Sequence, residues 1–407
     1  MRRHVFIVGC GFPQLGLIRA ARKLGYEITG ADLNSRAIGV READHFALAS
    51  TGDVAAIMST FRKSRATAIA TSGSELALTT TAAAADKLGL PFYADPETVY
   101  RCQAKDAMRA SYRAAGLEVP FFEHCQKLGD ARAFADRVGY PIVAKPAHGW
   151  GQRGVSRVES EADLVDAFDL ATRASHGGGG AVLEACIMGH EVSVNGWVEN
   201  GSLVAYCVTD REVFPGHRPL GVMRSEISPS VLEPAMVEMA VEASRHGARA
   251  LGLLRGPCYS QVAVSSQRAV LFETAARLGG GFDADVTALA SGVNLYERLL
   301  GVAFDDRSLE HGRTRHALRP AMVRFLKPSP GRVLAVEGVR ACRAMPGVVD
   351  VIVYPRIGDS LSALLDAAKR IGHILVQGDT REQMIATADE AERTIRIVVD
   401  NDTRNTS

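Results

Sequence analysis

The chain has no long hydrophobic run, no excess of charge of either sign and little aromatic content. Although 47% of its 407 residues are hydrophobic, none of the apolar runs approaches the roughly 18 residues that span a membrane. The 47 Lys and Arg residues and the 46 Asp and Glu residues leave a net charge of +1, whereas a general nucleic-acid binder would show a basic excess. We therefore predict a globular protein that binds neither a membrane nor nucleic acid.

Cysteine pairs with the spacing of a metal or redox site are also missing. The seven cysteines are scattered, with no CxxC motif and no Cys/His cluster, and a chain of this length needs no disulfides to be stable. The segment Ile7-Val8-Gly9-Cys10 resembles a lipoprotein cleavage site, but the apolar stretch before it starts only at Val5. A signal sequence needs about 7–15 apolar residues, so we expect reduced thiols and a cytoplasmic location.

Strands that alternate with helices fill the first hundred residues. Apolar periodicity and turn residues predict strands at 5–8, 27–32, 46–48 and 67–71 and helices at 14–25, 54–63 and 75–88. Such an alternation is typical of a parallel α/β sheet.

The rest of the chain divides into two further regions. The middle region has a predicted helix at 105–116 and predicted strands at 140–146, 192–198, 203–208, 260–264 and 270–273. Its short connections favour antiparallel pairing. The last region alternates again, with strands at 348–354, 373–376 and 395–399 and a helix at 360–370. The sequence thus predicts a mixed α/β and α+β fold with domains at 1–102, 103–318 and 319–400 and a frayed tail at 401–407.

A glycine-rich turn follows the first strand. Gly9 and Gly11 allow a tight turn, and Asp32 ends the second strand, where the ribose-binding acid of a dinucleotide site would lie. In the dinucleotide-binding motif the third glycine comes three residues after the second, but here Gly16 comes five after Gly11. A nicotinamide site is therefore the alternative, and a tight turn without a ligand is the favoured interpretation.

Lys145 ends a short strand and precedes a second glycine-rich segment, Gly149 to Gly154. A lysine in this position can hold phosphate oxygens while the amides of the loop surround the terminal phosphates. The order differs from a Walker loop, in which the lysine follows the glycines. Taken alone, Lys145 is equally compatible with a surface charge.

Two later segments carry further acidic residues. Glu184 and Glu191 flank a short apolar stretch that could offer backbone groups to adenine and a carboxylate to ribose. Glu273 ends an apolar strand, and Arg277 and the triplet Gly279-Gly280-Gly281 follow it. A carboxylate can bind Mg²⁺, a guanidinium can bind a carboxylate or phosphoryl group through two hydrogen bonds, and glycines let the backbone approach a ligand. Exposed glutamates and a surface Glu–Arg pair are the alternatives.

In this order the segments resemble the ATP-grasp superfamily, in its carboxylate–amine ligase branch of L-amino-acid ligases, bacilysin-type dipeptide synthetases and carnosine synthase. The resemblance covers nearly the whole chain. Residues 1–102 resemble the pre-ATP-grasp α/β domain, and 103–318 resemble the ATP-grasp domain with a mobile lid at about 120–185. Residues 325–399, which include Pro346-Gly347-Val348 and Arg370-Ile371-Gly372-His373-Ile374, resemble the C-terminal α/β domain of amino-acid ligases. The resemblance implies ATP and Mg²⁺ as cofactors.

The resemblance also implies roles for individual residues. Lys105 matches a lysine that opens a helix and reaches the nucleotide phosphates. The other implied nucleotide-binding residues are Lys145, Gly149, Gly151, Gly154, Glu184, Ala185, Ile187 and Glu191. Glu273 matches the main magnesium ligand. Arg277 matches the arginine of the E-x-[N/A]-x-R segment and, with Lys145, is expected to act in catalysis.

Two residues depart from the pattern of the family. Gln261 lies in the strand before Glu273, where the family usually has a second acidic metal ligand. An amide oxygen can bind Mg²⁺ but adds no negative charge. Ala275 stands where many relatives have a metal-binding asparagine. These departures leave a catalytically inactive nucleotide-binding protein as an alternative to an enzyme.

The resemblance implies an ATP-dependent ligase that phosphorylates a carboxylate and joins it to an amine, with small-molecule substrates of amino-acid type. A carboxylase-type enzyme that uses bicarbonate is a further alternative, and a homodimer is left open. No cysteine is needed for this chemistry. The candidate bases are His217, His246 and Glu226, and the candidate residues for a substrate carboxylate are Arg211, Arg218 and Arg224.

Overall fold

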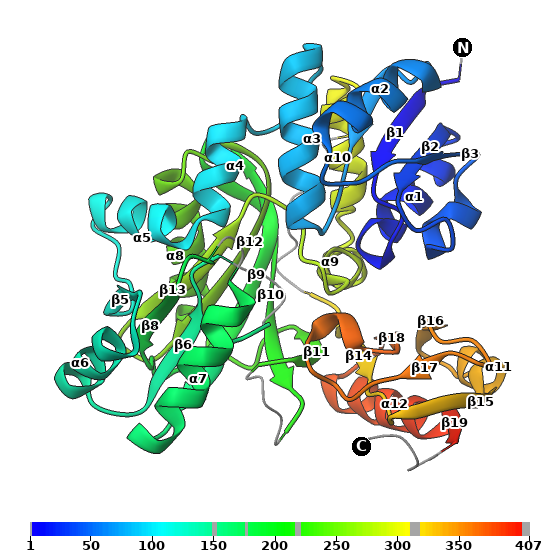
Figure 1. Ribbon diagram of the computed structural model, residues 1–407. Coiled ribbons are helices and arrows are strands. Elements are labelled where there is room, and N and C mark those ends of the chain that lie inside the picture. The colour runs from blue at the N-terminus through cyan, green and yellow to red at the C-terminus, as the bar shows by residue number, and fades with distance from the viewer. Residues whose placement is uncertain (1, 149–152, 176–177, 216–220, 310–317, 401–407) are drawn as a thin grey trace. The chain divides into compact units, whose positions relative to one another are not determined.

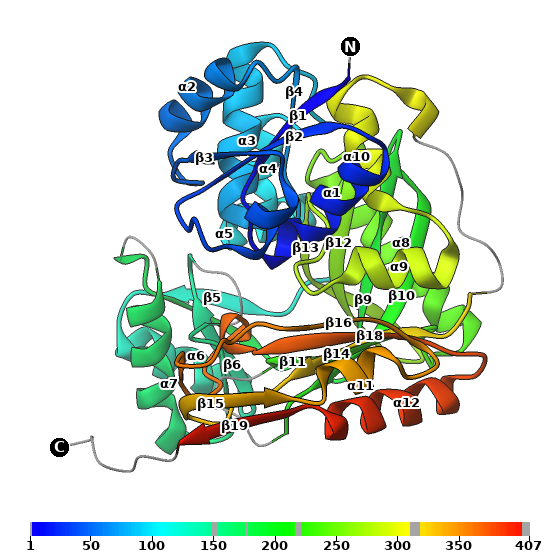
Figure 2. The same ribbon diagram turned by 90° about the vertical axis from the view of Figure 1, so that its right-hand side faces the viewer.

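The computed structural model describes residues 2–148, 153–175, 178–215, 221–309 and 318–400 (Figures 1 and 2). The chain folds into two compact units. The first unit takes the described residues of Met1–Val119, Glu191–Val208 and Leu232–Leu318, and the second those of Pro120–His190, Thr209–Val231 and Arg319–Ser407. Within these described ranges, no helix has both the length and the apolar character needed to cross a membrane.

The first unit begins with a four-stranded parallel sheet in the order β3-β2-β1-β4. Its strands are β1 (His4–Val8), β2 (Glu27–Asp32), β3 (His45–Leu48) and β4 (Ala68–Ala70). The helices around it are α1 (Phe12–Lys23), α2 (Val54–Ser64) and α3 (Glu75–Leu88), with a 3₁₀ helix, η1 (Ile38–Glu42) (Figure 1). All five residues of β1 are buried, as expected for a strand covered on both faces. The predicted parallel α/β sheet is confirmed.

The remainder of the first unit is built on antiparallel strands. Strand β12 (Arg255–Val264) lies between β13 (Ala269–Ala275) and β9 (His190–Glu199). The helices are α4 (Pro96–Gln103), α5 (Lys105–Ala114), α8 (Pro234–Ala250), α9 (Asp283–Ser291), α10 (Leu295–Ala303) and the 3₁₀ helix η3 (Arg307–Leu309). Val194, Val262 and Leu271 share a buried core with Val241 of α8. Because side chains alternate along a strand, the polar residues between these positions lie on the opposite face.

The second unit contains the predicted lid, residues 120–185. Its sheet has the order β5-β8-β6-β7 and is antiparallel. The elements are β5 (Phe122–Cys125), α6 (Leu128–Val138), β6 (Ile142–Pro146), β7 (Ser156–Val158), α7 (Glu161–Ala174) and β8 (Ala181–Ala185). Phe134, Ile142 and Leu164 belong to a core confined to this segment. The segment therefore has its own hydrophobic core, and its motion stays a prediction.

The second unit also contains the C-terminal region. Strand β10 (Ser202–Val213) continues into this unit from the first, and β11, β14, β18 and β16 follow it in an antiparallel sheet. Helix α12 packs against β14 and β18 through Met384 and Ala388, which meet Met322 and Ile374 (Figure 2). The bounds are β11 (Met223–Ser228), β14 (Ala321–Leu326), β15 (Gly331–Glu337), α11 (Val339–Arg343), β16 (Val348–Val353), β17 (Ser360–Leu361), η4 (Ala367–Lys369), β18 (Gly372–Gln377), α12 (Arg381–Thr394) and β19 (Arg396–Asp400).

The prediction of a helix at 360–370 is wrong. Ser360 and Leu361 pair instead with β15, in the small sheet β17-β15-β19. The carboxylate of Asp366 accepts a hydrogen bond from the amide of Ala368 at 2.8 Å, which closes a local turn that competes with a longer helix. Only the 3₁₀ helix η4 remains.

Candidate functional site

The glycine-rich turn after β1 has its amides satisfied within the first unit. The amide of Cys10 donates to the Asp32 carboxylate at 2.9 Å, and the amide of Gly11 donates to the side-chain oxygen of Gln14 at 3.1 Å. The amide of Gly9 donates to a carbonyl of β2 at 2.8 Å. Burial raises the pKa of the Cys10 thiol to about 12. These contacts favour the tight turn over a nicotinamide site, because Asp32 and the turn amides are already engaged.

Gln261 and Glu273 face each other across β12 and β13. The antiparallel register pairs these two residues directly, and both are half-buried. The side-chain amide of Gln261 donates to the Tyr259 hydroxyl at 2.8 Å, and Ser193 donates to the same hydroxyl at 3.4 Å. The amide oxygen and the carboxylate are both oxygen donors of the kind that Mg²⁺ prefers. The predicted antiparallel pairing is thus confirmed for these two strands, and metal binding by Gln261 and Glu273 stays a prediction.

Arg277 lies two residues beyond β13 and is largely buried, with 14% of its side chain exposed. Its Nε donates to Oε1 of Glu75 at 2.6 Å, and its guanidinium lies 5.4 Å from the centroid of the Tyr259 ring. Burial lowers the pKa of Arg277, but the carboxylates of Glu75 and Glu273 outweigh burial and raise it above its ordinary value. The surface Glu–Arg pair considered as an alternative is therefore wrong for Arg277.

Lys145 and Glu184 form an ion pair in the second unit. The ammonium and the carboxylate are 2.5 Å apart, and the two side chains are 12% and 5% exposed. Neighbouring strands bring them together, because β6 and β8 pair Lys145 with Val182 and Val143 with Glu184. The structure therefore unites two of the predicted nucleotide-binding residues in one contact, and neither is an exposed surface charge.

Two family models match this chain. An ATP-grasp domain matches residues 138–285, and an L-amino acid ligase C-terminal domain 2 matches residues 324–400. The chain therefore contains an ATP-grasp domain and an L-amino acid ligase C-terminal domain 2. These matches confirm the predicted resemblance to the ATP-grasp superfamily.

Curated relatives align with part of this chain. The y4rH protein of Sinorhizobium fredii is 27% identical over 293 residues, which are 70% of this chain and 59% of that protein. The D-alanine–D-alanine ligase of Frankia casuarinae is 41% identical over 91 residues, which are 22% of each chain. The chain thus spans less than two thirds of the length of these relatives.

Solved structures share the fold of this protein along nearly the whole chain. An L-amino acid ligase from Bacillus licheniformis has a TM-score of 0.81 at 21% identity, covering 98% of this chain and 99% of that one. A phosphoribosylglycinamide synthetase from Anaerococcus prevotii has a TM-score of 0.78 at 16% identity, covering 98% and 100%. The biotin carboxylase domain of a Hydrogenobacter thermophilus 2-oxoglutarate carboxylase, solved with MgADP and bicarbonate, has a TM-score of 0.76 at 18% identity, covering 98% and 91%. The predicted fold class is confirmed.

The other residues predicted to bind the nucleotide lie in different parts of the fold. Lys105 is the half-buried first residue of α5, and Glu191 is an exposed residue of β9. The amide of Ala185 already donates to the Phe121 carbonyl at 2.8 Å, and Ile187 is half-buried just after β8.

The predicted glycine loop, Gly149 to Gly154, lies only partly within the described residues. Gly154 has a φ of +73°, and a Cβ there would approach Ala174 to 2.5 Å and Pro146 to 3.0 Å. A side chain at this position would therefore be strained and crowded. Gly149 and Gly151 lie outside the described residues.

The candidate bases and carboxylate-binding arginines are mostly engaged in pairs. Arg211 and Glu226 form a buried ion pair at 3.6 Å, and Arg224 pairs with Glu392 at 3.0 Å. His246 lies half-exposed on α8, where it faces Glu242 at 3.8 Å. The remaining candidates, His217 and Arg218, lie outside the described residues.

Glu75 is the site residue that the sequence analysis missed. It precedes Arg277 by 202 residues, so neither spacing nor a local motif connects the two. Its one local signal is its place as the first residue of α3, directly after the Ser72-Gly73-Ser74 turn at the carboxyl end of β4. Ligands of α/β folds bind beside such strand ends.

Proposed function

We propose that this ligase joins a carboxylate to an amine, with amino-acid-like substrates, and converts ATP to ADP and phosphate. The observation that carries the proposal is the presence of an ATP-grasp domain and an L-amino acid ligase C-terminal domain 2 in one chain. The similarity in fold to an L-amino acid ligase over 98% of this chain supports it. A cytoplasmic location and a homodimer stay predictions.

The proposed reaction solves a leaving-group problem. An amine does not displace oxide or hydroxide from a carboxylate, so a carboxylate oxygen first attacks the γ-phosphorus of ATP, and ADP leaves. The amine nitrogen then attacks the acyl carbon, the C–O bond to phosphate breaks, and the amine loses a proton. Catalysis of such steps depends mainly on positioning and on the neutralisation of charge.

Polar and charged residues of the first unit could bind the magnesium ion, the phosphates and the substrate carboxylate. Glu273 and Gln261 would hold Mg²⁺, which supplies positive charge next to the phosphates when bound. Among the described residues, no group of three or more His, Cys, Asp or Glu side chains is arranged to hold a metal, so a cation here would complete its ligands with phosphate oxygens or water. Lys105 would bind nucleotide phosphates, and Arg277 would bind the carboxylate or the transferring phosphoryl group through its planar fork.

Residues of the second unit could bind the phosphates and the adenine of the nucleotide. Lys145 would bind phosphate oxygens while Glu184 balances its charge, and Ile187 would offer its backbone to adenine. In the first unit, Glu191 would bind the ribose hydroxyls. Closure of the lid would keep water from the acyl phosphate, since water competes with the amine for the activated carbonyl.

A bicarbonate-dependent carboxylase is the second candidate, because a biotin carboxylase domain shares the fold at a TM-score of 0.76. The C-terminal family match favours amino acids instead. A screen of pairs of L-amino acids for ADP release, with bicarbonate in parallel, tests both. Release that needs two amino acids supports the proposal, and release triggered by bicarbonate overturns it. No ADP with any pair would favour the inactive alternative suggested by Gln261 and Ala275.

A further inference from the structure

The side chain of Glu75 is held in place beside Arg277. Its backbone carbonyl accepts hydrogen bonds from Gln103 at 3.0 Å and Thr79 at 3.1 Å, and Ser74 caps the start of α3 by accepting from Ala77. The side chains of Glu75 and Arg277 are only 13% and 14% exposed. A residue fixed at the first turn of a helix has little freedom, so Glu75 can define the orientation of its partner.

The contact with Glu75 uses one edge of the guanidinium. Oε1 accepts from Nε at 2.6 Å, and the Leu278 carbonyl accepts from Nη1 at 3.0 Å. The two terminal nitrogens together carry four N–H groups, and one bond to Leu278 leaves donors that can bind a carboxylate from the end of the fork. Glu75 therefore holds the Nε edge, and the remaining N–H groups of the terminal nitrogens are candidate donors to a ligand.

The second oxygen of Glu75 has no such partner. Oε2 is buried and makes no hydrogen bond within the part of the chain that the structure describes. A buried carboxylate oxygen without a donor is costly, and proteins normally supply a donor from a side chain, a water molecule or a ligand. The charge of Glu75 makes a cationic donor the most favourable occupant.

Two further buried acceptors occur in the adjoining segments. Oδ1 of Asp283 and the hydroxyl of Ser72 have no hydrogen-bond partner among the described residues. The turn of Ser72 and the glycine loop that ends near Asp283 touch, since a Cβ on Gly280 would lie 2.9 Å from the Gly73 carbonyl oxygen. Unused acceptors, two of them carboxylate oxygens, therefore gather around the segment that carries Arg277.

We propose that Glu75 is a specificity residue for the carboxylate substrate. Oε1 orients Arg277 toward the substrate carboxylate, and Oε2 accepts a hydrogen bond from a positively charged nitrogen of the same molecule. The substrate activated by ATP is then a zwitterion with an ammonium group close to its carboxylate, and plain carboxylates are poor substrates. The inference rests on the proposed function.

The experiment compares substrates that differ only in the amine. ADP release by the wild-type chain is measured first with each of the twenty proteinogenic amino acids, in the presence of hydroxylamine as an amine that accepts the acyl group. The most active of them is then tested, again with hydroxylamine, against the carboxylic acid that lacks its amino group, for example L-alanine against propionate. Absence of amino-acid-dependent ADP would overturn the proposed function itself. Equal use of the amino acid and its desamino analogue would overturn the role of Glu75 and leave the proposed function intact.

Glu75→Gln keeps the size of the side chain and removes its charge. We expect the KM for the amino acid to rise about tenfold to a hundredfold, as for the loss of a charged hydrogen bond, while the KM for ATP stays within about twofold. The preference over the desamino acid should disappear. An unchanged preference in this variant, or an equal loss with both acids, would contradict the proposal.

Glu97→Gln is the matched control. Glu97 also lies in the first turn of a helix and also pairs with an arginine, Arg101, at 3.1 Å, but 68% of its side chain is exposed. We expect wild-type kinetics from this variant. Glu75→Asp keeps the charge and shortens the reach, so it should retain part of the preference for the amino acid, and complete loss in it would contradict a role of the charge. The wild-type comparison of the two acids decides the question even if a variant does not fold.

Discussion

Lys145 and Glu184 form an ion pair inside the predicted lid, so Lys145 has a structural contact beside its proposed role in nucleotide binding. Lys145→Ala should lower ATP turnover at least about a hundredfold through the loss of a phosphate contact. It should also lower the free energy of unfolding by about 1–3 kcal/mol, because a buried carboxylate loses its partner. ADP release and urea unfolding measure the two effects.

The double variant Lys145→Ala/Glu184→Gln separates these effects. Removing the charge of Glu184 should restore much of the stability without restoring turnover. Full turnover in the single variant would remove Lys145 from the nucleotide site.

Gln261 offers an amide oxygen where a carboxylate would bind a cation more strongly. Gln261→Glu should lower the Mg²⁺ concentration needed for half-maximal ATP hydrolysis, because an anionic oxygen is the better ligand for a hard cation. The Tyr259 hydroxyl, which now accepts from Gln261, can donate to the new carboxylate instead. Titration of the ATPase rate with Mg²⁺ checks this, and thermal unfolding of the same samples confirms that the variant folds. Identical Mg²⁺ dependence in both proteins would show that residue 261 does not face the metal.

The sequence predicted some residues of the candidate site, but it did not predict which side chains contact each other. The family pattern predicts Lys145, Glu273 and Arg277 as site residues, because each ends or follows an apolar strand. The partner of Arg277 was missed, because Glu75 comes from a different strand end and only the tertiary fold joins the two. Spacing along a chain does not report such long-range contacts.

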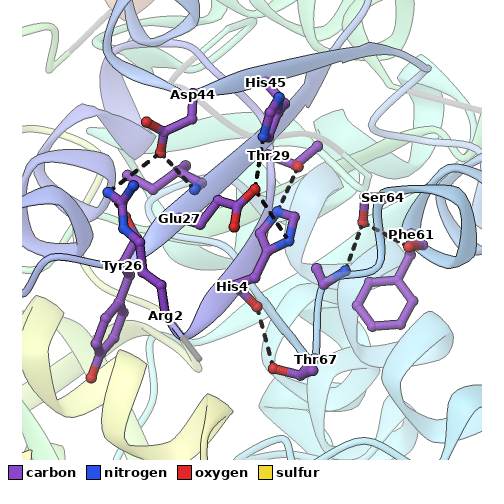
Figure 3. A network of polar contacts seen from close by, with 12 residues as sticks. Arg2, His4, Tyr26, Glu27, Thr29, Asp44, His45, Phe61, Ser64 and Thr67 are labelled. Carbon is purple, nitrogen blue, oxygen red and sulfur yellow. Dashed lines mark hydrogen bonds and ion pairs between the residues drawn. The ribbon is translucent and has the colours of Figure 1, made fainter.

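Among the elements, the N-terminal parallel strands carry a network of polar contacts around His4 and Glu27 (Figure 3). His4 of β1 lies 2.8 Å from the Thr29 hydroxyl of β2, and His45 of β3 lies 2.8 Å from the Glu27 carboxylate. Burial lowers the pKa of His4, and His45 and Arg2 lower it further, against the opposing effect of Glu27 and Asp44. Folding therefore favours the neutral form of His4.

The folded pKa of His4 lies below its ordinary value of 6.5, so the unfolded chain binds more protons in this range. The stability from neutral His4 is present above about pH 6.5 and is lost as the pH falls through the folded pKa. We expect the urea midpoint to fall between pH 7 and about pH 5. His4→Gln does not titrate and should show a smaller fall. An equal fall in both proteins would mean that other groups cause the acid sensitivity.

Element boundaries were readable where the periodicity was clear. The bounds of β2 and α3 agree with the strand predicted at 27–32 and the helix predicted at 75–88. The prediction of a helix at 360–370 was wrong for a physical reason. Ser360 and Leu361 pair with β15, and Asp366 closes a local turn, so the segment does not continue as a helix. Local periodicity does not reveal which other strand competes for a segment.

For the whole molecule, Mg-ATP should protect the chain against heat. Binding to the native state alone stabilises it by about 2.7 kcal/mol at a hundredfold excess over Kd. NADH should give no protection, because the turn after β1 uses its amides and Asp32 internally. Thermal unfolding with each ligand checks this. Protection by NADH without protection by Mg-ATP would make that turn the true nucleotide site.

The proposed acyl phosphate moves one carboxylate oxygen of the substrate into inorganic phosphate. The most direct measurement uses the most active L-amino acid, labelled with ¹⁸O in its carboxylate, together with ATP, Mg²⁺ and an acceptor amino acid. Mass spectrometry of the released phosphate should find one ¹⁸O atom per phosphate, with ADP as the other product. Unlabelled phosphate next to an amide product, or AMP and pyrophosphate in place of ADP, would contradict ligation through an acyl phosphate.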